Sequence, residues 1–277
     1  MPVSFLVGHW KKELQVFQEN FSTLLKTSNP DAIHDLRVAV KKLRSYYKFY
    51  SAVLETVPSA LFSETEKLFS TLGKQRNVEI CLELLSKLKY MEKLAALQRH
   101  FNIFLNETEL RSRIALTEYN LAALNKLTDK MEKTISIQPE QLIKNKAEYI
   151  FESTLHEVRH ELHRFDENFH LIRKKLKDVF YWSKMLPGNF YFSDDETKIL
   201  DNALENLGSG HDCEIMKKQA RQYRGNFVIK GSHEFMTLKE FEKLLKENKQ
   251  KKLDDAHELI KELLKEHKKT DEKIMNR

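Results

Sequence analysis

The sequence of 277 residues is long enough for one large domain or two smaller ones, and its 7 glycines and 5 prolines are unusually few. Charged residues make up 32% and hydrophobic residues 41%, a balance typical of amphipathic helices. The net charge is only +6, so the placement of Lys and Arg matters more than their excess. We find neither an apolar run long enough to span a membrane nor a signal-peptide pattern, and therefore expect a cytoplasmic protein.

Helix signals follow one another along the whole chain. Asn29-Pro30 provides an N-cap followed by a proline in the first turn, and Ser63 and Ser193 each begin a capping-box pattern. Residues 187–189, Pro-Gly-Asn, are typical of a turn. We predict helices over about 3–27, 30–54, 63–89, 91–134 (one or two), from 140, and over roughly 154–185, 194–207 and 237–268. The sequence therefore predicts an all-α fold.

A weak internal repeat links the two halves of the chain. IHDLRVAVKKLRSYYKFY, from Ile33, is similar to LHEVRHELHRFDENFHLI, from Leu155. TLGKQRNVEICLELL, from Thr71, is similar to NLGSGHDCEIMKKQA, from Asn206. The offset is 122 residues for His34 and His156 but 135 for Gly73 and Gly208, which requires an insertion of 13 residues. We interpret the chain as one compact domain, 1–277, of two pseudo-symmetric helical-bundle halves, about 1–135 and 139–277.

Each copy of the first repeat segment carries basic residues on one helix stripe, because positions three and four apart are neighbours on a helix. The first stripe consists of His34, Arg37, Lys41, Arg44 and Lys48, and the second of His156, Arg159, His163 and His170, flanked by Arg164 and extended by Arg173-Lys174-Lys175. Like charges at these spacings repel one another, and an anionic ligand would relieve that repulsion. Most charged helix faces are merely solvated, and we interpret the mixed-charge C-terminal helix in that way.

Chemical motifs give little support for catalysis. HEVRH at 156–160 matches the H-E-x-x-H zinc pattern, but Arg159 lies inside the match and the repeat partner HDLRV lacks the second histidine. We therefore predict no metal site and no cofactor. The sequence contains no phosphate-binding glycine loop and no G-x-S-x-G nucleophile motif. His34 and His156 fit a structural role and a phosphate-binding role equally well.

The patterns HDLRVAVKKLR at 34–44 and LGKQRNVEI at 72–80 resemble the CHAD family, the conserved histidine α-helical domain. HEVRHELHR at 156–164 and LGSGHD at 207–212 resemble its second repeat, so the resemblance covers nearly the whole chain. It implies two four-helix-bundle-like halves with a basic groove or pore between them that binds inorganic polyphosphate. The binding residues implied by the resemblance and the stripe are His34, Arg37, Lys41, Lys42, Arg44, Lys48, Arg76, His156, Arg159, His163, Arg164 and His211.

This sequence departs from the family pattern at Asn77, which replaces an acid, and at His163 and Asp166, which replace basic residues. We predict non-catalytic binding of polyphosphate, and the family resemblance adds an expected association with polyphosphate granules. Two alternatives stay open: binding of nucleic acid or another polyanion, and a helical scaffold for another protein. The aromatic residues lie mainly on the apolar stripe, which argues against stacking on single-stranded bases. No membrane partner is expected.

Overall fold

The computed structural model describes residues 3–55, 62–186 and 191–275, and these residues form helices and no strand. The elements are α1 (Val3–Leu24), α2 (Pro30–Val53), α3 (Ser63–Lys87), α4 (Ala95–Glu118), α5 (Leu121–Ser136), α6 (Glu140–Glu161), the short 3-10 helix η2 (Leu162–Arg164), α7 (Phe165–Met185), α8 (Asp194–Phe227) and α9 (His233–Met275). The predicted all-α fold is confirmed. Over the described ranges, no helix combines the length and apolar character that a membrane span requires.

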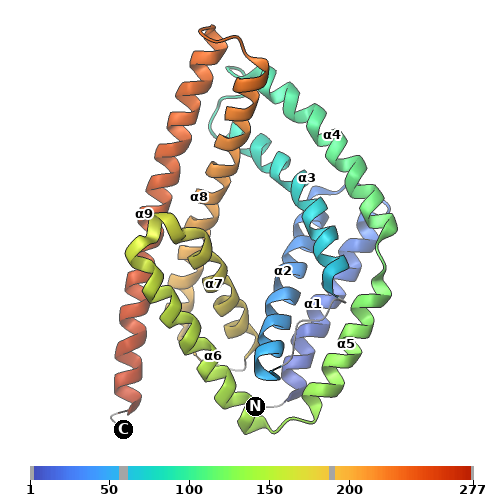
Figure 1. The fold of residues 1–277 in the computed structure, drawn as a ribbon, viewed down its shortest axis with the longest axis vertical. Coiled ribbons are helices and arrows are strands. Elements are labelled where there is room, and N and C mark those ends of the chain that lie inside the picture. Colours follow the sequence, from blue (N-terminus) through green and yellow to red (C-terminus); the bar gives the residue numbers. More distant parts are fainter. Residues whose placement is uncertain (1–2, 56–61, 187–190, 276–277) are drawn as a thin grey trace.

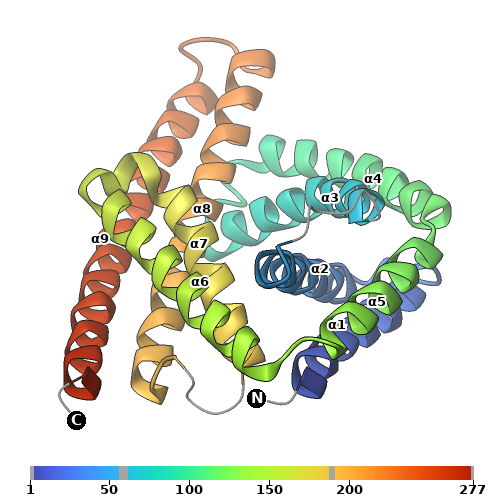
Figure 2. The same ribbon diagram turned by 60° about the horizontal axis from the view of Figure 1, so that its bottom comes forward.

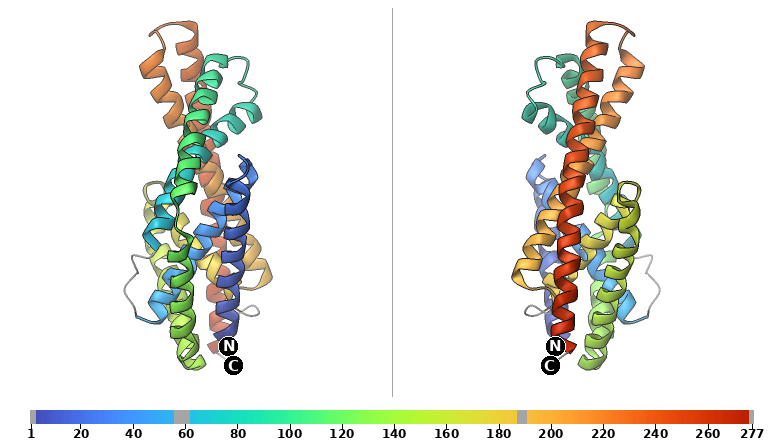
Figure 3. Two further views of the ribbon diagram at one scale, coloured as in Figure 1. Left: turned by 90° about the vertical axis from the view of Figure 1, so that its right-hand side faces the viewer. Right: turned by 90° about the vertical axis from the view of Figure 1, so that its left-hand side faces the viewer.

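The helices lie in two groups that face each other (Figure 1). α2 and α3 lie toward the middle on one side with α1, α4 and α5 outside them, and α7 and α8 lie opposite with α6 and α9 outside. Figure 2 shows the same arrangement from below, with α2 inside the ring of helices. The molecule is long and narrow from the side, and the turn between α8 and α9 lies far from the start of α1 (Figure 3).

One hydrophobic core joins the two groups. It contains buried side chains from every α-helix, from Leu6 of α1 to Leu264 of α9. The fully buried Trp182 of α7 donates from its indole Nε1 to the carbonyl of Ser45 in α2, at 2.9 Å. A second, smaller core packs the ends of α3 and α4 against α8 and α9. α2 and α7 are therefore fixed against each other by a shared apolar interior.

Two of the three predicted helix caps are confirmed. The side chain of Asn29 accepts from Asp31 N at the start of α2, and Ser193 forms a complete capping box with Glu196 at the start of α8. The capping box predicted at Ser63 is wrong: α3 begins there, but Phe62 is the N-cap and no side chain caps it. The turn predicted at 187–189 lies outside the described residues.

The predicted end of a helix near residue 207 is also wrong, because α8 continues to Phe227. Its internal Gly210 is accommodated by close packing. A Cβ atom at Gly210 would lie 3.2 Å from Leu253 Cδ2 and 3.7 Å from the carbonyl of Lys249, both in α9. The absence of a side chain there lets α8 and α9 approach closely, and the contact offsets the usual cost of glycine inside a helix.

The helical pattern over 154–185 contains a break that the sequence analysis did not predict. α6 ends at Glu161, η2 turns the chain, and α7 runs back along α6 (Figure 1). No Gly or Pro marks this turn, but charges do: Arg159 and His160 are in the last turn of α6, and Asp166 and Glu167 are in the first turn of α7. This arrangement suits the dipoles of a helix end and a helix start. The predicted second basic stripe is therefore divided between two helices.

Candidate functional site

Basic side chains from both groups of helices lie close enough to shift one another's pKa. α2 contributes Arg37, Lys41 and Arg44, α3 contributes Arg76, and α7 contributes Arg173 and Lys177. We call these six residues the cation cluster. It unites residues more than 130 positions apart in the sequence because α2 packs directly on α3 and α7.

Two lysines of the cluster have strongly lowered pKa values. Burial, followed by the charges of Lys177 and Arg37, lowers the pKa of Lys41 to about 7. Burial and the charge of Arg173 lower the pKa of Lys177 to about 8, against the opposing effect of Asp212. Near neutral pH, Lys41 is therefore only partly protonated. An anion beside these amines would favour their charged forms and raise both pKa values.

Arg37 is held in a recess of α3. Its Nη1 donates to the carbonyl of Phe69 at 2.5 Å, and its guanidinium carbon lies 4.1 Å from the centre of the Phe69 ring. A Cβ atom at Gly73 would lie only 2.6 Å from Arg37 Nη1. Burial, then Arg76 and Arg44, lowers the pKa of Arg37 to about 10. The glycine of the LGKQRN motif thus makes room for a half-buried guanidinium.

The second half repeats this arrangement at α7 and α8. Arg173 Nη2 lies 4.0 Å from the Cβ position of Gly208, as Arg37 lies beside Gly73. The spacing H-x-x-R-x-x-x-K at 34–41 recurs at 170–177. The offset is 136 residues from His34 to His170 and 135 residues from Gly73 to Gly208, so no long insertion is needed. We prefer this register to the one that pairs His34 with His156.

Few acids balance the cluster. Arg76 donates to Glu79 at 3.1 Å and to Glu83 at 2.8 Å. Asp212 lies near Arg173, yet burial raises the pKa of its carboxyl group. Across the described residues, the other five members form no salt bridge: Arg37, Lys41, Arg44, Arg173 and Lys177. The cluster therefore keeps an excess of positive charge in a partly buried setting.

Two predicted residues of α2 point to acids instead. Lys42 Nζ pairs with the buried Glu13 of α1 at 2.9 Å. Lys48 Nζ pairs with Asp178 of α7 at 2.6 Å, and so links the two helices. His34 is exposed as a whole. Partial desolvation of its ring, followed by the charges of Arg76 and Lys41, lowers its pKa. Of the predicted first-half residues, Arg37, Lys41, Arg44 and Arg76 belong to the cluster, and His34 lies at its edge.

The predicted second-half residues divide between two places. His211 of α8 adjoins the cluster: burial, followed by the charge of Arg173, lowers its pKa to about 4, so its ring is neutral at pH 7. The other four lie on α6 and η2: His156, Arg159, His163 and Arg164.

The contacts of these four residues are local. Arg164 pairs with Glu167, and His163 Nδ1 contacts the carbonyl of His160. His156 is exposed, while Arg159 is partly buried. Nothing in these contacts tests their predicted binding role, and beside the cation cluster we expect them to contribute little to binding. The cluster residues that the sequence analysis did not single out as binding residues, Arg173 and Lys177, could have been found from the H-x-x-R-x-x-x-K spacing.

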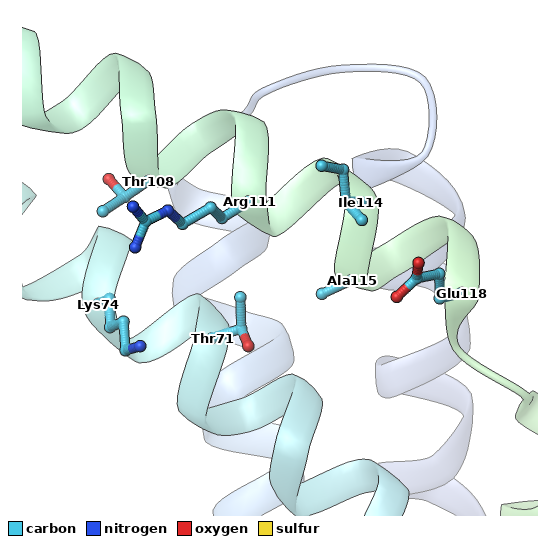
Figure 4. A pocket seen from close by; sticks show the side chains of 7 residues that line it. All are labelled: Thr71, Lys74, Thr108, Arg111, Ile114, Ala115 and Glu118. Carbon is cyan, nitrogen blue, oxygen red and sulfur yellow. The ribbon is translucent and has the colours of Figure 1, made fainter.

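A separate hollow of about 290 Å³ lies between α3 and α4 (Figure 4). The side chains of Lys74 and Arg111 lie at one end of it and that of Glu118 at the other. The hydroxyls of Thr71 and Thr108 already donate to carbonyls of their own helices. This hollow has fewer cations than the cluster, and the carboxylate of Glu118 in its wall would repel an anion. We therefore do not consider it the functional site.

Comparison with known proteins gives one family. The CHAD domain family model matches residues 9–221. A crystal structure of the CHAD domain from the plant Ricinus communis has a TM-score of 0.74 to this structure at 17% sequence identity, and the match covers 93% of this chain and 91% of that chain. No curated protein matches. The structural likeness at this identity concerns the fold, while the family model covers most of the chain. The protein belongs to the CHAD domain family.

Proposed function

We propose that the protein binds inorganic polyphosphate through the cation cluster, without catalysing a reaction on it. The observation that carries this proposal is the gathering of half-buried cations from α2 and α7: burial, followed by the repulsion of neighbouring cations, lowers the pKa of Lys41 to about 7 and that of Lys177 to about 8. Bound phosphate oxygens would remove that repulsion and favour the protonated lysines. The resemblance to the CHAD family supports polyphosphate as the anion.

The chemistry of the cluster suits a chain of phosphates. Arginine offers a planar fork of donors that fits phosphate oxygens, and lysine adds a compact charge. Because Arg37 and Lys41 come from one half and Arg173 and Lys177 from the other, one extended anion would contact both halves. A small anion would neutralise only part of such a cluster.

Titration of the purified chain with long-chain polyphosphate tests the proposal. We expect binding at low salt and a steep loss of affinity as salt rises, because counterions are released from the polyanion. Competition with DNA and RNA at equal phosphate concentration separates the alternatives. Displacement of polyphosphate by nucleic acid would support a general polyanion site instead, and absence of binding at low salt would exclude the proposal.

Gly73→Ala should weaken polyphosphate binding more than Gly208→Ala. The new methyl group at position 73 would lie 2.6 Å from Arg37 Nη1 and force the guanidinium away from Phe69, whereas the nearest atom at position 208 is 4.0 Å away. We expect a loss of roughly tenfold for Gly73→Ala, equal to one charge-assisted contact. Calorimetric titration of both variants with polyphosphate measures the loss of affinity, and their melting temperatures show whether the fold is retained. Equal affinities for both would show that Arg37 does not need its recess.

A further inference from the structure

Three potential metal ligands converge beside the cation cluster. They are His170 of α7 and His211 and Glu214 of α8, and their ligand atoms all lie within 4.8 Å of one another. His170 Nε2 is 2.8 Å from Glu214 Oε2, and the rings of His170 and His211 are 5.1 Å apart and nearly perpendicular. In the part of the chain that the structure describes, no other His, Cys, Asp or Glu side chains form such a group of three.

Helix geometry explains why these ligands meet. His211 and Glu214 are three positions apart and so lie on one face of α8. α7 packs against α8 and presents His170 to that face. Nδ1 of His211 is buried and makes no hydrogen bond within the described residues, so no protein donor competes for its lone pair.

Neighbouring side chains hold the ligands in place. Lys249 of α9 donates to Glu214 Oε1 at 3.2 Å, which leaves Oε2 directed to His170. The ring of Phe169 lies 3.9 Å from the ring of His170, and Lys249 Nζ lies 4.5 Å from the centre of Phe169. Such outer contacts orient metal ligands and contribute to metal affinity.

We propose that His170, His211 and Glu214 bind one divalent transition-metal ion of the zinc class. Two imidazoles and one carboxylate are a donor set typical of zinc sites that keep a fourth position open to an external ligand. Arg173 and Lys41 place positive charge near His211 and would disfavour a bare cation. An anionic fourth ligand, such as a phosphate oxygen, would offset that charge. This proposal replaces the expectation of no metal site, and it does not depend on polyphosphate binding.

Titration of the full-length, chelator-treated protein with Co²⁺ alone tests the site directly. Co²⁺ replaces Zn²⁺ in such sites and gives visible absorption bands that report histidine and carboxylate coordination. We expect one Co²⁺ per chain, displacement of the bands by Zn²⁺, and a rise in melting temperature on addition of either ion. Absence of the bands and of any shift in melting temperature would overturn the proposal.

Variants then identify the ligands. His170→Ala and Glu214→Gln should each weaken metal binding by roughly tenfold or more. Glu214→Gln is nearly isosteric, so it keeps the packing of α7 and α8 even if the alanine variant loses stability. The matched control is His156→Ala combined with His160→Ala, which removes the H-E-x-x-H match on α6 and should leave metal binding unchanged. If the control loses the metal, or if Glu214→Gln and His170→Ala both keep it, the assignment is wrong.

Discussion

Replacing Lys41 and Lys177 together by methionine is expected to stabilise the free protein and to weaken polyphosphate binding on the order of a hundredfold. Burial and mutual repulsion disfavour both charges in the folded protein, as their lowered pKa values show. Methionine keeps most of the aliphatic stem and removes the buried amine. The melting temperature should therefore rise by several degrees, while two charge-assisted contacts to phosphate are lost.

The matched control for this variant is Lys174→Met. Lys174 lies on α7 close to Lys177 in sequence but is exposed, so its replacement should change stability and affinity little. Thermal unfolding and calorimetric titration at one salt concentration provide both measurements. If the double variant is less stable than the parent protein, or if the control weakens binding as much, the half-buried Lys41 and Lys177 are not the destabilising, ligand-binding pair described above.

Raising the pH from about 7 to about 8.5 is expected to stabilise the free protein while it weakens polyphosphate binding. Lys41 has a pKa of about 7 and Lys177 of about 8 when folded, and 10.5 is the ordinary value for lysine. The unfolded chain therefore binds more protons across this window, and the free energy of unfolding rises with pH. Polyphosphate prefers the protonated lysines, so its affinity falls as they lose their protons.

Chemical denaturation and polyphosphate titration at several pH values measure these opposite trends. The pH range ends at about 8.5 because burial raises the pKa of the Cys81 and Cys213 thiols in the folded protein. Above about pH 9 these thiols therefore favour the unfolded chain, and stability would fall as pH rises. The variant with methionine at positions 41 and 177 should flatten both trends. If stability and polyphosphate affinity change in the same direction with pH in the parent protein, the assignment of both effects to these lysines is wrong. The same holds if the variant shows the same pH dependence as the parent protein.

The sequence predicted the first half of the site better than the second. The stripe from His34 to Arg44 follows from helix spacing, and the structure brings three of its residues into the cluster with Arg76. Helix spacing does not reveal tertiary ion pairs. Lys42 pairs with Glu13 of α1 and Lys48 with Asp178 of α7, so both of these predicted binding residues are balanced by acids from other helices.

The second half was harder to predict because the turn at η2 lacks Gly and Pro. Without a visible break, residues 154–185 gave one apparent stripe, although the structure divides them between α6 and α7. Local similarity at His156 favours one register of the repeat, whereas the nearly equal offsets of His170 and Gly208, 136 and 135 residues, favour another. The buried environment that lowers the pKa of Lys41 and Lys177 depends on packing between helices and has no signature in the sequence.

Polyphosphate titration across a salt series, in three double variants, tests the shared site most directly. Arg37→Gln with Lys41→Gln and Arg173→Gln with Lys177→Gln should each weaken binding and reduce the salt dependence by about two phosphate contacts. Arg159→Gln with Arg164→Gln, on α6 and η2, should leave affinity and salt dependence nearly unchanged. If the α7 pair has no effect while the α6 and η2 pair abolishes binding, polyphosphate does not lie between α2 and α7.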